Sequence, residues 1–148
     1  MQNNKEKLED FKTAISSTVK SISNSQKVEI SFGNEISDTN KYTIKLPNIE
    51  RVSNKINFEE IRAAADSKSL RHRFSNKETF KKFEPEGNIS KKLYDISEKI
   101  RCEKIGTSYF KGVKNNIENF YQKRIAEIDL KSSESKVVES FENYLRVK

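Results

Sequence analysis

Four charged residues recur along one predicted helix, and they are the first place where this chain could do chemistry. Asp95, Glu98, Arg101 and Glu103 put one arginine among three carboxylates, on a helix that we expect to begin near Asn88. Residues three or four apart on a helix are neighbours, so the ordinary interpretation is a solvated ion-pair network in which each pair stabilises by roughly tenths of a kcal/mol. The alternative is an arginine that faces a partner protein, or a buried pair that fixes helix register. We favour the solvated network.

A second charged pair precedes this helix. Asp66 and Arg71 lie five residues apart near the end of another predicted helix, and we hypothesise that they pair with Asp95 or Arg101 where two helices pack. Such pairing would explain polar groups on otherwise apolar faces, because a charge leaves water only when it is paired. The candidate network for partner binding or structure is Asp66, Arg71, Asp95, Glu98, Arg101 and Glu103.

The densest basic patch interleaves cations with aromatic residues. Its basic members are Arg71, Arg73, Lys77, Lys81 and Lys82, with His72 among them, and its phenylalanines are Phe74, Phe80 and Phe83. A nucleic-acid interface would place the cations on phosphates and stack the rings on bases. We favour a solvated basic face with phenylalanines as core anchors, since no RRM, KH or helix-turn-helix signature accompanies the patch.

Signatures of catalysis and of metal or nucleotide binding are missing from the sequence. One cysteine, Cys102, and one histidine, His72, allow neither an internal disulfide nor a Cys/His zinc cluster. There is no P-loop, no G-x-S-x-G elbow and no D-x-S-x-S cation motif. We therefore predict no catalytic, cofactor-binding or metal-binding residue here. Cys102 is expected to be a small packed residue, and His72 a surface or capping residue.

Composition indicates one folded domain over residues 1–148. Leu, Ile, Val and Phe make up 37 of 148 residues, which exceeds the ~20% level below which high charge predicts disorder. The net charge of +7 favours acidic partners, whether nucleic acid, anionic lipid or acidic protein. The start carries no secretory signal and no stretch reaches ~18 consecutive apolar residues, so we expect a cytoplasmic protein that does not enter a membrane.

The first third of the chain shows helical and then strand periodicity. Apolar residues recur every three or four positions, which predicts a first helix within Met1 to Ser25. Two alternating segments follow, and we predict that they form an antiparallel hairpin over Gln26 to Pro47, with a mobile tip at Asn34 to Lys41. A lone hairpin is marginally stable, so its apolar face should pack on helices. The segment Asn48 to Lys55 is expected to be loop.

Helical periodicity dominates from Asn57 to Lys148. Asn57 is a candidate helix cap, and Ser75 to Glu78 form a capping box that should begin a short helix. Asn88 can cap the central helix, Gly106 either breaks or only bends that helix, and a last helix is expected near Ser135 to Arg146. The predicted fold class is mainly α within α+β, with five or six helices and a small antiparallel hairpin.

Several short segments of the chain carry a resemblance through their order and spacing. They are Val28 to Gly33, Lys45 to Pro47, Ala65-Asp66-Ser67, Leu70-Arg71, Pro85-Glu86-Gly87, Asp95, Glu98, Arg101, Glu103-Lys104-Ile105-Gly106 and Gly112-Val113. Over most of its length the chain resembles the amino-terminal region of CobT, a subunit of aerobic-type cobaltochelatase.

The resemblance implies a non-catalytic domain that supports ATP-dependent insertion of Co²⁺ into hydrogenobyrinic acid a,c-diamide in cobalamin biosynthesis. It implies docking to a CobS-like AAA+ ATPase and a CobN-like large chelatase subunit, within a ligase that forms nitrogen–metal bonds. ATP, Mg²⁺ and Co²⁺ would serve the complex, and the full-length subunit would form a ring. An acidic linker and a von Willebrand A-type domain are expected beyond Lys148. The alternatives are a basic helical nucleic-acid-binding module or a regulatory protein-interaction domain.

Overall fold

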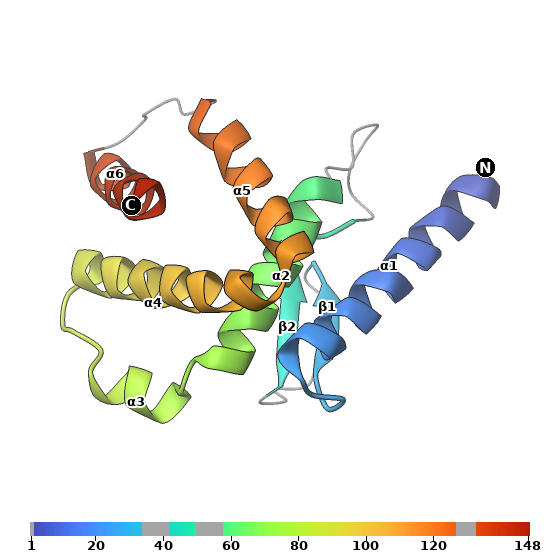
Figure 1. Cartoon of the computed structure of the whole chain (residues 1–148), viewed down its shortest axis with the longest axis horizontal. Coiled ribbons are helices and arrows are strands. Elements are labelled where there is room, and N and C mark those ends of the chain that lie inside the picture. The colour runs from blue at the N-terminus through green and yellow to red at the C-terminus, as the bar shows by residue number, and fades with distance from the viewer. Residues whose placement is uncertain (1, 34–41, 50–57, 127–132) are drawn as a thin grey trace. The chain divides into compact units, whose positions relative to one another are not determined.

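The computed structural model describes residues 2–33, 42–49, 58–126 and 133–148, which contain six helices and two short strands (Figure 1). This composition confirms the predicted mainly helical α+β class. The chain divides into two compact units, residues 1–73 and residues 74–148. The prediction of one domain over the whole chain stays a prediction.

Helix α1 (Gln2–Ser23) opens the first unit and confirms the predicted first helix. It ends where Asn24 adopts a left-handed conformation with φ of 54°. The Ser25 N–H donates to the Lys20 carbonyl and the Asn24 N–H donates to the Ser21 carbonyl, both at 3.2 Å. These two bonds satisfy carbonyls that the last turn leaves open, as in a Schellman motif.

Strands β1 (Glu29–Phe32) and β2 (Thr43–Leu46) pair in parallel, so the predicted antiparallel hairpin is wrong. Glu29 lies opposite Thr43 and Phe32 lies opposite Leu46. Alternation with period two is the same for either strand direction, and ten residues, 33–42, connect the strands. That length exceeds a tight turn and lets the chain return to the start of the sheet before the second strand begins.

The sheet turns one face to a helical layer. Ile44 and Leu46 are buried in a core cluster with Ile15 and Val19 of α1, and Ile30 and Phe32 pack against that cluster. The expectation that the apolar strand face packs on helices is therefore confirmed. Gly33 ends β1 with φ of 72°, and a Cβ there would lie 2.7 Å from the Asn48 Cβ, so this close turn requires glycine.

Helix α2 (Phe58–Phe74) reaches the same core through small residues. Ala65 is fully buried within the cluster, and Ala64 packs against it. Alanine has no side chain beyond Cβ, so the helix backbone can approach the strands closely. The buried Ser69 hydroxyl donates to the Ala65 carbonyl at 2.6 Å, which satisfies a polar group inside this layer.

Two of the predicted helix starts in the second unit are shifted by one residue. Helix α3 (Lys77–Lys82) is capped by Asn76, whose side chain accepts from the Thr79 N–H at 2.9 Å, rather than by Ser75 of the predicted capping box. Helix α4 (Asn88–Tyr109) begins after Gly87 and has no side-chain cap, so the predicted Asn88 cap is wrong. Gly87 has φ of 89°, a conformation that residues with a side chain rarely adopt, so glycine occupies the cap position and Asn88 is the first residue of the helix.

The remaining helices follow α4 without a break at Gly106. Gly106 is buried inside α4, and the chain turns instead at Phe110, whose N–H donates to the Gly106 carbonyl before α5 (Lys111–Ala126) begins. Helix α6 (Ser133–Val147) confirms the predicted last helix. Both α5 and α6 pack against α4.

Three predictions fall outside the described residues. They concern the tip of the strand connection at residues 34–41, the Asn57 cap and most of the loop predicted over residues 48–55. Ile49, within the described part of that loop, is buried.

Strand direction can be tested by cysteine cross-linking in a Cys102→Ala background. Parallel pairing places residues 29 and 43 side by side, about 5 Å apart, so Glu29→Cys with Thr43→Cys should oxidise readily. An antiparallel pair with the same buried face would instead join residues 29 and 45, which lie about 8 Å apart in the parallel register. Faster disulfide formation by Glu29→Cys with Lys45→Cys, measured by non-reducing electrophoresis, would contradict the parallel sheet.

Candidate functional site

Two ion pairs join α4 to α6 in the second unit. The Lys99 ammonium lies 2.7 Å from Glu142 Oε1, and an Arg146 guanidinium nitrogen lies 2.7 Å from Glu103 Oε2. A second guanidinium nitrogen of Arg146 lies 2.9 Å from Glu142, which links the two pairs through α6. Glu103 and Glu142 are buried. A connected set of charges, largely shielded from solvent, therefore holds the two helices together.

The arrangement of these pairs fixes the register of the two helices. Each pair joins residues 43 apart in the chain, so one turn of α4 faces one turn of α6. On α4 a cation precedes an anion by four residues, and on α6 an anion precedes a cation by four. Sliding α6 by one turn would place Glu142 beside Glu103, or Arg146 beside Lys99. Like charges would then meet in a buried interface, where their repulsion is poorly screened.

Tyr121 of α5 completes the cluster. The Arg146 guanidinium carbon lies 3.2 Å from the centre of the Tyr121 ring, and the Lys99 ammonium donates to the Tyr121 hydroxyl at 3.2 Å. A cation over an aromatic face is attracted by the ring quadrupole, more strongly when both groups are shielded from water. Side chains from three helices thus share one polar centre.

The surroundings shift the pKa values of three groups in this centre further away from pH 7. Burial alone would lower the pKa of Lys99, but Tyr121 and Glu142 outweigh it and the pKa is raised. Burial would raise the pKa of Glu142, yet Lys99 and Arg146 lower it overall. Burial raises the pKa of the Tyr121 hydroxyl more than the two cations lower it. None of these three groups exchanges a proton near pH 7, which is where a general acid or base works best.

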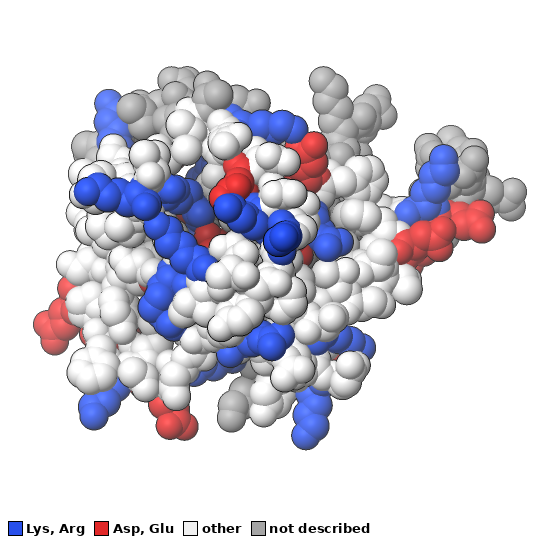
Figure 2. Space-filling model, in the orientation of Figure 1, with Lys and Arg blue, Asp and Glu red and all other residues white. Residues whose placement is uncertain are grey.

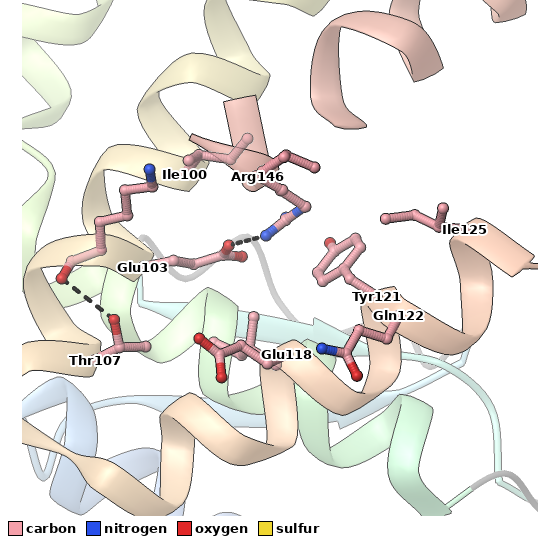
Figure 3. A pocket seen from close by; sticks show the side chains of 11 residues that line it. Ile100, Glu103, Thr107, Glu118, Tyr121, Gln122, Ile125 and Arg146 are labelled. Atoms are coloured by element: carbon pink, nitrogen blue, oxygen red, sulfur yellow. Dashed lines mark hydrogen bonds and ion pairs between the residues drawn. The ribbon is translucent and has the colours of Figure 1, made fainter. Parts of the chain in front are cut away.

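A pocket of about 300 Å³ opens beside the polar centre (Figure 3). Its walls come from α4, α5 and α6, and Figure 3 shows Glu103 and Arg146 meeting at one side of it. This volume is at the lower end of the roughly 300–1,000 Å³ of ligand pockets. The lining residues are Ile100, Glu103, Lys104, Thr107, Ile117, Glu118, Tyr121, Gln122, Ile125, Arg146 and Val147.

Arg101 and Glu98, from the predicted network, form a further ion pair, this one within α4. Arg101 Nε lies 2.7 Å from one Glu98 oxygen, and Arg101 also donates to the other oxygen at 2.8 Å. The same guanidinium donates to the carbonyl of Phe74 at 2.9 Å, at the end of α2. Arg101 therefore caps a helix end as well as pairing with its neighbour three residues away. These hydrogen bonds, chiefly the one from Arg101, lower the pKa of Glu98 to about 2 despite its partial burial.

The other members of the predicted network are distributed over both units. Asp66 is fully buried and its carboxylate lies 3.2 Å from Arg62 of the same helix. Arg71 is half-buried, Asp95 is exposed, and Glu103 belongs to the α4–α6 ion pairs. Pairing of Asp66 or Arg71 with Asp95 or Arg101 would join the two units and stays a prediction, as does a partner-binding role for the set.

The basic patch also draws on both units. Arg73 donates to the Ile22 carbonyl at 3.1 Å in the first unit, and Lys77, Lys81 and Lys82 are exposed on α3 in the second. That these cations form one surface therefore stays a prediction. Figure 2 shows more basic than acidic side chains on the face in view, in keeping with the net charge of +7.

The predicted role of the phenylalanines is confirmed only in part. Phe83 is 63% exposed, so its assignment as a core anchor is wrong. It follows the last turn of α3, a helix with no buried residue, and the Lys82 ammonium lies 5.5 Å from its ring centre. Phe80 stacks on Tyr94 with 4.6 Å between ring centres, and Phe74 stacks on Tyr109 at 6.3 Å. These two rings pack within the protein.

Cys102 and His72 have ordinary surroundings. Cys102 is fully buried on α4, as predicted for a small packed residue. His72 is half-buried near the end of α2, with its ring centre 6.2 Å from that of Tyr42. Among the described side chains, no three or more His, Cys, Asp or Glu groups gather in a way that could hold a metal ion.

Sequence reasoning found Glu103 but missed four members of the polar centre. These are Lys99, Tyr121, Glu142 and Arg146. A signal was present, because Lys99 with Glu103 and Glu142 with Arg146 are both i, i+4 charge pairs of reversed sign order. Matching such pairs between predicted helices would have suggested this contact.

Substitution of Glu98 should give a pH-dependent loss of stability. Glu98→Gln should lower the free energy of unfolding by about 1–3 kcal/mol at pH 7, because it removes a charged, two-point hydrogen bond. The folded pKa, about 2, lies below the ordinary value of 4.5, so this stability is present above pH 4.5 and is lost as the pH falls toward 2. Urea unfolding at several pH values should show wild type and variant converging in acid.

The matched control for this variant is Glu84→Gln. Glu84 lies 3.4 Å from Lys91 in an exposed pair, so its loss should cost no more than about 0.5 kcal/mol at any pH. A pH-independent difference for Glu98→Gln would contradict the role of its carboxylate charge.

Removal of the Arg146 charge should loosen α6. Arg146→Met leaves Glu103 and Glu142 buried with one cation fewer, and breaking a buried pair in this way typically costs about 3–5 kcal/mol. Amide hydrogen exchange should show lost protection in α6. Lys114→Met, which removes the cation of the exposed Lys114–Glu118 pair, is the control and should leave α6 protected. Unchanged exchange in Arg146→Met would show that the charges do not hold α6.

No helix within the described residues combines the length and the apolar character needed to cross a lipid bilayer.

The comparison with solved structures found no match. The comparison with protein families gave a match to the family described as cobalamin biosynthesis protein CobT, over residues 5–145. The match covers nearly the whole chain and confirms the resemblance seen in the sequence. The chain belongs to the CobT family, which takes part in cobalamin biosynthesis as a subunit of cobaltochelatase.

Proposed function

We propose that this chain is the non-catalytic amino-terminal domain of a CobT-like subunit, and that it supports ATP-dependent insertion of Co²⁺ into hydrogenobyrinic acid a,c-diamide. It acts by docking to a CobS-like AAA+ ATPase and a CobN-like large chelatase subunit. The observation that carries the proposal is the family match over residues 5–145. The ATPase subunit uses ATP and Mg²⁺, and Co²⁺ is a substrate of the complex.

The chemistry of the described residues supports a non-catalytic role. The charged groups of the polar centre form ion pairs with one another: Glu142 pairs with Lys99 and Arg146, and Arg146 also pairs with Glu103. Burial raises the pKa of the Tyr121 hydroxyl. A group that is paired in this way stabilises structure and is poorly placed to transfer a proton to a substrate. The domain therefore contributes contact surface and rigidity.

Rigidity matters for the proposed mechanism because motion in an ATPase ring must be transmitted through the subunits bound to it. A helix held in register by buried charges moves as a body with its neighbours instead of sliding past them. The net charge of +7 favours association with acidic partner surfaces and should speed encounter with them.

Reconstituted cobalt insertion tests this proposal. Reactions with the ATPase subunit, the large subunit and a CobT-like subunit should insert cobalt when residues 1–148 are present and lose most insertion when they are omitted. The chain alone should neither hydrolyse ATP nor insert cobalt. Insertion is followed by the absorbance change of the macrocycle, and association by co-purification. If omission of residues 1–148 changes neither insertion nor co-purification, the docking role is wrong.

A further inference from the structure

Helix α6 carries half-buried apolar side chains on one face and exposed apolar side chains on another. The helix contacts α4 through the polar centre, and its Val138 and Leu145 are half-buried. On the outer face Val137 is 52% exposed, Tyr144 is 60% exposed and Val147 is 84% exposed. Large apolar side chains scattered singly on a surface are ordinary, but a contiguous group of them marks an interaction site.

The exposed residues form one stripe. Val137 and Tyr144 are seven residues apart, which is two helical turns, and Val147 follows three residues later. Val147 also lines the pocket between α4, α5 and α6, together with Ile125 of α5, which is 40% exposed. The stripe therefore continues into the mouth of the pocket, where Figure 3 shows Ile125 and Tyr121 on α5. We call Val137, Tyr144, Val147 and Ile125 with the pocket the α6 face.

The pocket continues the apolar stripe inward. Ile100 and Ile117 are buried and line it, so an apolar side chain that enters at Val147 meets aliphatic groups. Pockets of this kind receive the anchor residues of protein partners, which supply most of the binding energy of an interface. Helix α6 does not need its outer face for its own packing, because buried ion pairs hold it on α4.

Cations border the α6 face. Lys136 and Lys148 are exposed at the two ends of the stripe, and the Lys148 ammonium lies 5.5 Å from the Tyr144 ring centre. Lys104, which lines the pocket, is exposed as well. By contrast, Glu103 and Glu142 are buried and paired with the cations of the polar centre, and the exposed Glu118, which also lines the pocket, lies 3.8 Å from Lys114. The border therefore offers positive charge to a partner, and carboxylates on that partner would complement it.

We propose that the α6 face is the docking site for an amphipathic segment of a partner chelatase subunit, with apolar side chains that cover the stripe and enter the pocket and with carboxylates that meet Lys104, Lys136 and Lys148. This inference rests on the proposed docking function and names the face and the partner chemistry that it uses. A second copy of this chain and an anionic lipid surface are the competing occupants.

Binding measurements with the purified ATPase subunit and large subunit test the face. The whole chain should bind one of them, and Tyr144→Glu with Val147→Glu should raise the Kd about tenfold or more, because it removes apolar contact and adds repulsion. Phe83→Glu replaces an equally exposed aromatic residue outside the face and should leave the Kd within about twofold. Lys136→Gln with Lys148→Gln should weaken binding and reduce its salt dependence. Circular dichroism and thermal unfolding confirm that each variant is folded.

The outcomes separate this inference from the proposed function. If the wild-type chain binds a subunit and the folded Tyr144→Glu, Val147→Glu variant binds equally well, the α6 face is the wrong site and the docking function stands. If the wild-type chain binds neither subunit, both are overturned. Concentration-dependent dimerisation that this variant abolishes would assign the face to a second copy, and variant-sensitive binding to phosphatidylserine vesicles would assign it to lipid. Either result overturns the proposal, as does an unchanged salt dependence in the lysine variant.

Discussion

The second unit depends on two buried ion pairs of opposite order. Lys99 with Glu142 and Glu103 with Arg146 join helices whose contacting residues are 43 positions apart, and any shift by one turn would bring like charges together. An apolar interface of similar area would tolerate sliding far better, because burial of apolar surface is not directional. Charge order thus selects one register, which is the best-attested role of buried polar groups in proteins.

That register determines what the unit can present to a partner. With α6 fixed on α4 through a polar centre, its apolar side chains Val137, Tyr144 and Val147 stay on the surface. Tyr121 ties α5 into the same centre, and the pocket forms where the three helices meet. The charges of the polar centre are paired with one another, while several apolar side chains of α6 are exposed, and this arrangement agrees with the proposed docking function.

The first unit is built on a different principle. Its core joins a small parallel sheet to α1 and α2 through aliphatic residues, and fully buried Ala65 lets α2 approach the strands. Close approach of this kind tolerates little added volume, because protein interiors are packed as densely as organic crystals. The two units therefore reach specificity by different routes, through shape in the first and through charge order in the second.

The sequence by itself determined the features that depend on neighbours along the chain. Apolar residues that recur every three or four positions predicted α1, and the short segments that resemble CobT predicted membership in that family. Tertiary structure decided the strand direction, the cap at Gly87, the exposure of Phe83 and the pairing of Glu103 with Arg146. Periodicity reports which side of a helix or strand is apolar, whereas these features depend on which distant segment the folded chain brings opposite that side. Sequences with the same periodicity can pair their helices and strands in different ways.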